Sequence, residues 1–165
     1  MFSRLKNFFS NNPRIHDRTS PLNYDNWFHL DAETLAEQGI AEAYDRILPE
    51  LRKHVANPAT IQEIIEPDIP LYAISCNSEK YVIYPSNEPD TPEASWARAT
   101  FFFFLCINQQ LTSTDVLFYA INADNDLGGM FLTALEVEQA QALISSKKDW
   151  PYIPTLESPW YGMHN

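Results

Sequence analysis

The sequence is poor in glycine and cysteine. Only 4 of its 165 residues are glycine and 2 are cysteine. So few cysteines exclude a fold held together by several disulfide bonds, and no Cys-x-x-Cys or His-Glu-x-x-His pattern indicates a metal site. Cys76 and Cys106 both lie among apolar residues, which is typical of buried free thiols in a reducing compartment. A single disulfide between them is the alternative, and it requires Cα atoms within about 7 Å.

Long apolar runs are also absent. The longest extends from Phe101 to Ile107, which is much shorter than the roughly 20 residues that cross a membrane as a helix. Basic residues near the N-terminus, Arg4 and Lys6, are not followed by the apolar segment of a secretory signal. The sequence therefore predicts a soluble, cytoplasmic protein without stable membrane association.

Basic residues are scarce as well. The chain has 11 of them against 22 acidic residues, which gives a net charge of -11 at neutral pH. The imbalance is uneven, because residues 1–20 carry a net charge of +3 and residues 21–165 carry a net charge of -14. Such a body repels nucleic acid, which binds proteins through neutralisation of its phosphates. It attracts a basic protein partner, although surplus negative charge also serves solubility alone.

Enough apolar material is present for one folded domain. Hydrophobic residues make up 45% and aromatic residues 13% of the sequence, and this length fits one domain better than two. Residues 1–20 are predicted to form a short amphipathic helix, up to Ser10, and an extended lead-in. Residues 21–165 are predicted to form the domain.

Hydrophobic spacing predicts three main helices, over residues 31–55, 91–110 and 133–148. Each is preceded by a residue that caps helices well, namely Asp31, Thr91 and Thr133. Pro49 lies inside the first helix, so a kink or division is expected near Leu48. The second helix is apolar almost all round, which predicts burial on most sides.

Four further segments are predicted to be strands, over residues 71–76, 80–84, 116–121 and 129–132. The first two are joined by a short loop at residues 77–79, and the last two by a turn at residues 122–128. Strands joined by short loops pair antiparallel. The predicted class is therefore α+β, with one antiparallel sheet built from two hairpins, about three helices packed on it, and an extended proline- and aromatic-rich C-terminal tail.

The turn at residues 122–128 has a partial calcium-loop pattern. Asp124, Asp126 and Gly129 match positions one, three and six of such a loop. Leu135 then stands at position twelve, where a bidentate glutamate is required. A hairpin turn is the favoured interpretation, and no metal or other cofactor is predicted.

Catalytic motifs are absent too. Nucleophilic catalysis requires Cys or Ser beside a base, and none of the histidines belongs to a motif; these are His16, His29, His54 and His164. We therefore predict a protein that is not an enzyme. The alternative is a small enzyme or ligand-binding domain that uses the Asp124–Asp126 loop or a pocket near Cys76.

Acidic clusters and tail aromatics are the candidates for a partner-binding surface. The candidate residues are Glu63, Glu66, Asp68, Glu88, Asp90, Asp124, Asp126, Trp160 and Tyr161. Carboxylates suit a basic partner, and Trp and Tyr are frequent anchors at interfaces. The alternative is that the acids form a solvated surface and that the aromatic tail seals the core.

Three segments carry a resemblance to a known family. Residues 118–133 (FYAINADNDLGGMFLT), 149–152 (DWPY) and 159–162 (PWYG) resemble a family of small uncharacterised bacterial proteins. The likeness extends from about Trp27 to the C-terminus, and the chain looks like a neisserial member. Similar proteins are found near loci for secreted polymorphic toxins, so the resemblance implies an immunity protein and no catalytic residue.

Two main classes of function follow. The first is an acidic binding protein, most concretely an immunity protein that neutralises a basic toxin, such as a nuclease, by direct binding. The second is the small enzyme or ligand-binding domain described above, and a housekeeping or structural role is a third. The missing catalytic motifs favour the first class, and a homo-oligomer is compatible with all three.

Overall fold

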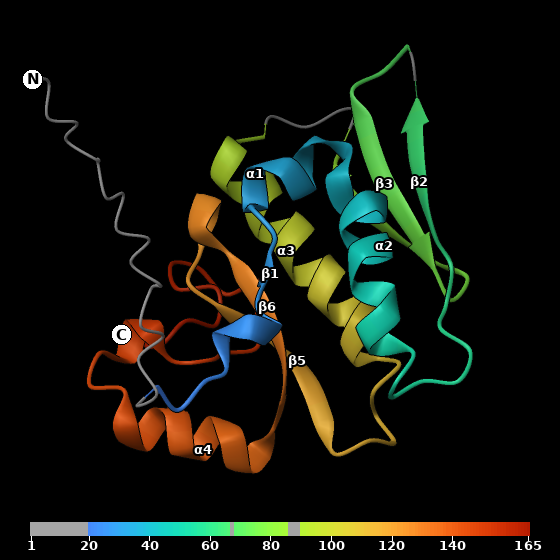
Figure 1. Cartoon of the computed structure of the whole chain (residues 1–165). Coiled ribbons are helices and arrows are strands. Elements are labelled where there is room, and N and C mark those ends of the chain that lie inside the picture. Colours follow the sequence, from blue (N-terminus) through green and yellow to red (C-terminus); the bar gives the residue numbers. More distant parts are fainter. Residues whose placement is uncertain (1–19, 67, 86–89) are drawn as a thin grey trace, which may run out of the picture.

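The computed structural model describes residues 20–66, 68–85 and 90–165. The amphipathic helix predicted at residues 1–10 and the candidate residue Glu88 lie outside these ranges. The described residues form two antiparallel three-stranded sheets and three main helices, which confirms the α+β class (Figure 1).

The first sheet has the strand order β1-β6-β5 and the second the order β2-β3-β4. Their bounds are β1 (Phe28–His29), β2 (Ile61–Glu66), β3 (Leu71–Cys76), β4 (Glu79–Tyr84), β5 (Val116–Ile121) and β6 (Gly128–Thr133). The prediction of one antiparallel sheet is therefore wrong. The predicted pairs β3–β4 and β5–β6 do form, but each recruits a third strand and belongs to a different sheet.

Helix α3 (Pro92–Asn108) explains why the two sheets are separate. It contacts both β4 and β5, so it lies between the sheets, with α2 (Ile40–Leu51) beside it (Figure 1). A helix that is apolar almost all round can bury two faces at once. Helix α4 (Ala134–Leu143) covers the other face of the first sheet, where its Val137 and Ala140 pack on that sheet.

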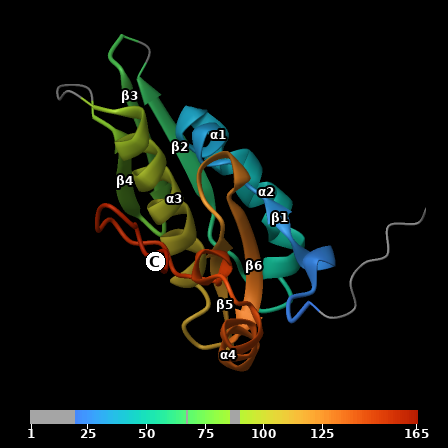
Figure 2. The ribbon, with the colours of Figure 1, turned by 90° about the vertical axis from the view of Figure 1, so that its left-hand side faces the viewer.

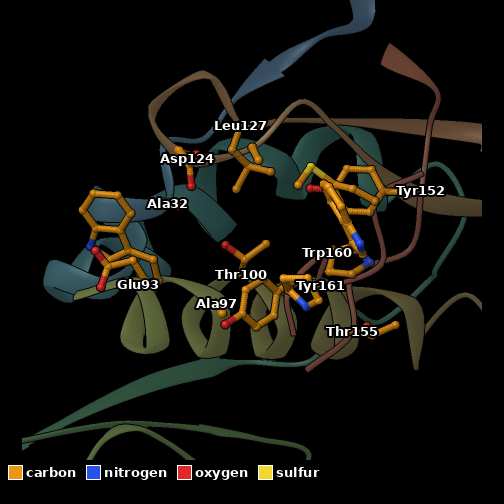
Figure 3. A pocket seen from close by; sticks show the side chains of 15 residues that line it. Ala32, Glu93, Ala97, Thr100, Asp124, Leu127, Tyr152, Thr155, Trp160 and Tyr161 are labelled. Atoms are coloured by element: carbon orange, nitrogen blue, oxygen red, sulfur yellow. The ribbon is translucent and has the colours of Figure 1, made fainter. Parts of the chain in front are cut away.

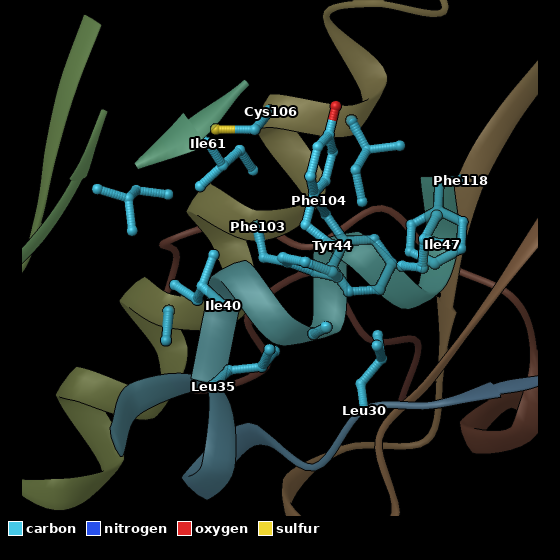
Figure 4. Packing of buried hydrophobic residues seen from close by; sticks show 14 of the residues in the cluster. Leu30, Leu35, Ile40, Tyr44, Ile47, Ile61, Phe103, Phe104, Cys106 and Phe118 are labelled. Atoms are coloured by element: carbon cyan, nitrogen blue, oxygen red, sulfur yellow. The ribbon is translucent and has the colours of Figure 1, made fainter. Parts of the chain in front are cut away.

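The main core lies between the sheets and is rich in aromatic rings (Figure 4). Phe118 from β5 is fully buried, and its ring centroid lies 4.8 Å from that of Phe104 and 4.7 Å from that of Phe131. Gly129 on β6 leaves room for this ring, because a Cβ there would lie 2.1 Å from the Phe118 ring. The Phe118 ring can therefore occupy this position in the core only because Gly129 opposite it has no side chain.

The first predicted helix is broken at Gln38 rather than at Pro49. It starts as α1 (Ala32–Thr34), is interrupted by a kink within Leu35–Gly39, where Glu37 and Gln38 have non-helical backbones, and resumes as α2. Gln38 has a left-handed backbone with φ of 69°. A Cβ at Gly39 would lie 2.5 Å from the Thr34 carbonyl oxygen, so the chain can approach itself only at a glycine. Helix α2 then passes through Pro49, which lies in its last turn, without being divided there.

The helix predicted to end near Lys147 ends earlier, at Leu143. Its start is as predicted, since Thr133 and Glu136 form a capping box. Ile144 is extended, and the indole Nε1 of Trp150 donates a hydrogen bond of 2.8 Å to its carbonyl oxygen. This bond gives the Ile144 carbonyl oxygen a donor, which in a longer helix would have been a backbone N–H. No helix within the described ranges is both long and apolar enough to cross a membrane.

The outer edge of β5 is occupied by groups from α3, from the C-terminal tail and from the turn that precedes the strand. Asn108 at the end of α3 accepts from the Phe118 N–H at 2.7 Å and donates to the Phe118 carbonyl at 2.9 Å. Ala120 exchanges two backbone bonds with Tyr152, and the Val116 N–H donates to the Thr114 hydroxyl. Every second residue of β5 thus has a partner on the side that faces away from β6.

Candidate functional site

The C-terminal tail is fastened to the first sheet by Tyr152. The backbone bonds between Tyr152 and Ala120 measure 2.8 and 2.9 Å, and the Tyr152 hydroxyl donates to the Asn122 carbonyl at 2.8 Å. The Tyr152 side chain is only 5% exposed and belongs to the main core. The tail after this residue therefore starts from a fixed point beside α3 (Figure 2).

Beyond that point the chain closes into a loop, residues 155–163, which we call the tail loop. The Thr155 N–H donates to the Tyr161 carbonyl at 3.0 Å, and the Tyr161 N–H donates to the Glu157 carbonyl at 2.8 Å. Tyr161 and Gly162 have left-handed backbones with φ of 48° and 96°. A Cβ at Gly162 would lie 2.3 Å from the Ile153 carbonyl oxygen, so the tight closure requires glycine there.

The turn between β5 and β6 forms the opposite wall of the site. It contains a 3₁₀ turn at Asp124–Asp126, and it is connected to the start of α1. The Leu30 N–H donates to the Leu127 carbonyl at 2.9 Å, and the Asn125 side chain donates to the Glu33 carboxylate at 3.1 Å. The turn is therefore held in place by contacts far from it in sequence.

A pocket of about 200 Å³ lies between the tail loop, this turn and α3, and we call it the tail pocket. Four aromatic and two acidic side chains contribute to its lining, namely Trp96, Tyr152, Trp160, Tyr161, Glu93 and Asp124. Figure 3 shows Asp124 on the side of the turn and Trp160 and Tyr161 on the side of the tail. Its lining includes no lysine, arginine or histidine among the described residues.

The electrostatic character of the pocket is negative. Burial and, as a smaller cause, the nearby Asp124 carboxylate raise the pKa of Tyr152 above its usual value, so this hydroxyl stays neutral. Within the described ranges the ion pairs are Lys53 with Glu50 and Arg98 with Asp90. Neither pair includes a carboxylate of the tail pocket, so no ion pair with a described residue neutralises that charge.

A second hollow of about 430 Å³ shares Trp96 with the tail pocket. Its lining includes the carboxylates of Glu33, Glu37 and Asp90. Acidic residues therefore line both hollows, although Asp90 is paired with Arg98.

Three of the predicted partner-binding residues meet in the tail pocket, namely Asp124, Trp160 and Tyr161. Asp126 is exposed on the same turn but does not line the pocket, so the two aspartates do not converge there. Glu66 and Asp68 are exposed near the far end of β2. The predicted candidates therefore do not form one continuous patch.

Glu63 has a role inside the fold. Its carboxylate accepts a hydrogen bond of 2.7 Å from the Tyr72 hydroxyl and one of 3.2 Å from the Ala41 N–H. Ala41 lies in the first turn of α2, where a negative charge is favourable. Burial and the Glu63 carboxylate raise the pKa of Tyr72. We therefore leave Glu63 out of the candidate surface.

Three aromatic or acidic residues of the pocket are not among the predicted partner-binding residues, namely Glu93, Trp96 and Tyr152. A signal for the first two existed. Glu93, Trp96, Ala97 and Thr100 are spaced three, four and seven residues apart, so they share one face of α3. No local pattern indicates that the tail lies over this face.

The alternative sites have weaker support. Cys76 and Cys106 are both free and fully buried, and contact with Cys76 together with burial raises the pKa of the Cys106 thiol. Cys76 lines neither hollow described above. In the described part of the chain, no three His, Cys, Asp or Glu side chains lie close enough to hold a metal ion.

Comparisons with family models, with curated proteins and with solved structures find no match to this chain. The family resemblance carried by residues 118–133, 149–152 and 159–162 therefore stays a prediction.

Proposed function

We propose that the chain is a binding protein that recognises a basic protein partner through its acidic surface. The observation that carries this proposal is a large negative charge that few ion pairs among the described residues neutralise. Residues 21–165 have a net charge of -14. The ion pairs formed by the described residues involve only Glu50 and Asp90. Charge of one sign that faces solvent speeds the encounter with a partner of opposite sign.

The tail pocket supports the proposal from a second direction. Trp160 and Tyr161 lie at the surface beside Asp124, so the pocket combines the aromatic anchors typical of interfaces with a carboxylate. The most concrete form of the proposal is an immunity protein that blocks a basic toxin by covering its active site. The alternative in which Asp124 and Asp126 act together on one ligand or substrate loses support, because the two residues do not share a pocket.

Affinity capture from the native cell tests the proposal. The whole chain is used as bait at about 50 mM and about 500 mM NaCl, and captured proteins are identified by mass spectrometry. We expect a protein of high isoelectric point that is retained at low salt and released at high salt. Its binding is then measured again with both proteins purified.

A charge-reduced bait sharpens the experiment. The triple variant Glu66→Gln, Asp68→Asn and Asp126→Asn removes three exposed charges without touching the tail pocket. We expect weaker binding and a shallower salt dependence for this bait. Captured proteins that are not basic, or binding that neither salt nor the triple variant weakens, would contradict the proposal.

A further inference from the structure

We infer that the tail pocket is a binding site for an organic cation, the guanidinium or alkylammonium group that ends an arginine or lysine side chain. The inference rests on the proposed function for the source of that cation, which would be a residue of the partner. The chemistry of the pocket itself is argued from the residues that line it.

Aromatic faces are the first part of the argument. Trp160 is 44% exposed although it lies at the pocket, whereas Tyr152 beside it is 5% exposed. Tyr152 thus seals the core, whereas Trp160 lines the pocket and keeps surface that a ligand would cover. Cations bind over the faces of aromatic rings, and Trp is the strongest partner in such contacts. Two tryptophans and two tyrosines contribute to one small pocket.

The carboxylates are the second part. Glu93 comes from α3 and Asp124 from the β5–β6 turn, so negative charge reaches the pocket from two separate elements. No described cationic side chain lines the pocket to satisfy them. A guanidinium or ammonium group would supply the missing opposite charge, and an anion would be repelled.

The start of α3 does not make the pocket an anion site. The Thr91 hydroxyl accepts the Ala94 N–H, and Pro92 has no N–H to offer. Glu93 places a negative charge in the same first turn, where it opposes the positive end of the helix dipole.

Size and rigidity are the third part. The volume of about 200 Å³ is smaller than the roughly 300–1,000 Å³ of pockets that enclose whole drug-sized molecules, and suits the end of one side chain. The tail loop is closed by its own backbone bonds, and the turn is bonded to the start of α1. The pocket is therefore formed by contacts that need no ligand, which lowers the cost of binding.

Small probes test the inference directly. The intact chain is titrated with N-acetyl-arginine amide, with N-acetyl-lysine amide and with the neutral isostere N-acetyl-citrulline amide, and the indole N–H signals of the tryptophans are followed by NMR. We expect both cations to shift the Trp160 and Trp96 signals at about millimolar concentrations, and citrulline to shift neither. Equal shifts with citrulline, or no shift of Trp160 with either cation, would overturn the inference.

Matched variants separate the pocket from general surface charge. Asp124→Asn and Trp160→Ala are each expected to weaken cation binding about tenfold. Asp126→Asn is the control for Asp124, because it is exposed on the same turn but does not line the pocket. Tyr24→Ala is the control for Trp160, because Tyr24 is 45% exposed and does not line the pocket. The controls are expected to change binding less than twofold, and thermal unfolding verifies that each variant is folded.

The outcome also distinguishes the sources of the cation. If the captured partner binds Trp160→Ala much more weakly than the wild type, the cation belongs to the partner, and both proposals stand. If the arginine probe binds the wild type but Trp160→Ala leaves partner binding unchanged, the pocket serves a free organic cation, and the partner docks elsewhere. If a basic partner binds with strong salt dependence while no cation probe shifts Trp160, the inference fails and the proposed function survives.

Discussion

The side chains around Phe118 and those of the tail pocket are both rich in aromatic rings, but the surroundings of the rings differ. Phe118 is fully buried, and its nearest rings, those of Phe104 and Phe131, are also hydrocarbon. Trp160 is 44% exposed, and two carboxylates line the same pocket. Burial of the rings around Phe118 removes apolar area from water, and this stabilises the folded chain without any partner. In the tail pocket, Trp160 retains exposed ring surface that a ligand or partner can bury.

This difference gives each region its own type of experiment. Substitutions of Phe118 and its neighbours should change the free energy of unfolding, and substitutions of the exposed pocket residues Trp160 and Asp124 should change binding. Tyr152 belongs to both regions and is left out of the comparison. A large effect of Trp160 on stability, or a small effect of Phe118, would remove the distinction.

The largest expected effect is that of Phe118→Ala. Loss of the ring should lower the free energy of unfolding by about 3–5 kcal/mol, because neighbouring side chains refill such a cavity only in part. Trp160→Ala should lower it by less than about 1 kcal/mol, since the ring is already partly solvated. Urea unfolding of both variants measures the difference, and comparable losses would contradict the comparison.

Asn108→Ala should have the next largest effect. It removes both side-chain bonds to Phe118 and leaves a buried N–H and carbonyl without partners, which costs about 1–3 kcal/mol. Gln109→Ala, at the exposed neighbouring position, is the control and should cost less than about 0.5 kcal/mol. Equal losses in urea unfolding would show that the Asn108 bonds contribute little.

Alkaline pH should affect both regions through tyrosine. Burial raises the pKa of Tyr72 in the core and of Tyr152 at the pocket, so both hydroxyls stay neutral in the folded chain. In the unfolded chain a tyrosine ionises near its ordinary pKa of 10.0. Stability is therefore fully present below about pH 10 and falls as the pH rises above it, by at most about 1.4 kcal/mol per pH unit for each tyrosine.

Urea midpoints between about pH 8 and pH 11 measure this effect. Tyr72→Phe and Tyr152→Phe should each make the fall shallower. Asp124→Asn should do so only slightly and only through Tyr152, because the Asp124 charge is the smaller cause of that shift. If both phenylalanine variants leave the fall in stability unchanged, the fall is caused by groups other than Tyr72 and Tyr152.

The smallest expected effect lies outside both regions, at Gln38. Its left-handed backbone costs a side-chain-bearing residue about 1–2 kcal/mol, and glycine avoids that cost but loses more entropy on folding. Gln38→Gly should therefore raise the free energy of unfolding by about 0.5–1 kcal/mol. Glu37→Gly, next to it with a negative φ of -95°, should not stabilise the chain, and equal gains from both would contradict the strain at Gln38.

Local chemistry explains the parts of the fold that the sequence predicts well. Thr91 accepts the Ala94 N–H and Thr133 forms its capping box, because a cap depends on residues only three positions away. Asn77 and Ser78 both have positive φ in the turn between β3 and β4, and Asn suits this conformation. These features need no knowledge of distant segments.

Long-range packing explains what the sequence could not predict. The apolar run Phe101–Ile107 indicates burial but not that α3 would separate two sheets. Pro49 is a stronger breaker by type than Gln38, yet the break occurs where Gly39 allows close approach to Thr34. The tail pocket joins residues near positions 93–100, 124 and 160, and only the folded chain brings them together.

The occupied edge of β5 has a consequence for how this molecule can meet another chain. Strand addition requires a row of free N–H and carbonyl groups, and along this edge Thr114, Asn108 and Tyr152 already use them. An extended segment of another protein cannot continue the first sheet there without displacing all three. Neither self-association nor partner docking can therefore use backbone pairing at β5. Any partner that binds at this edge must make its contacts with side chains.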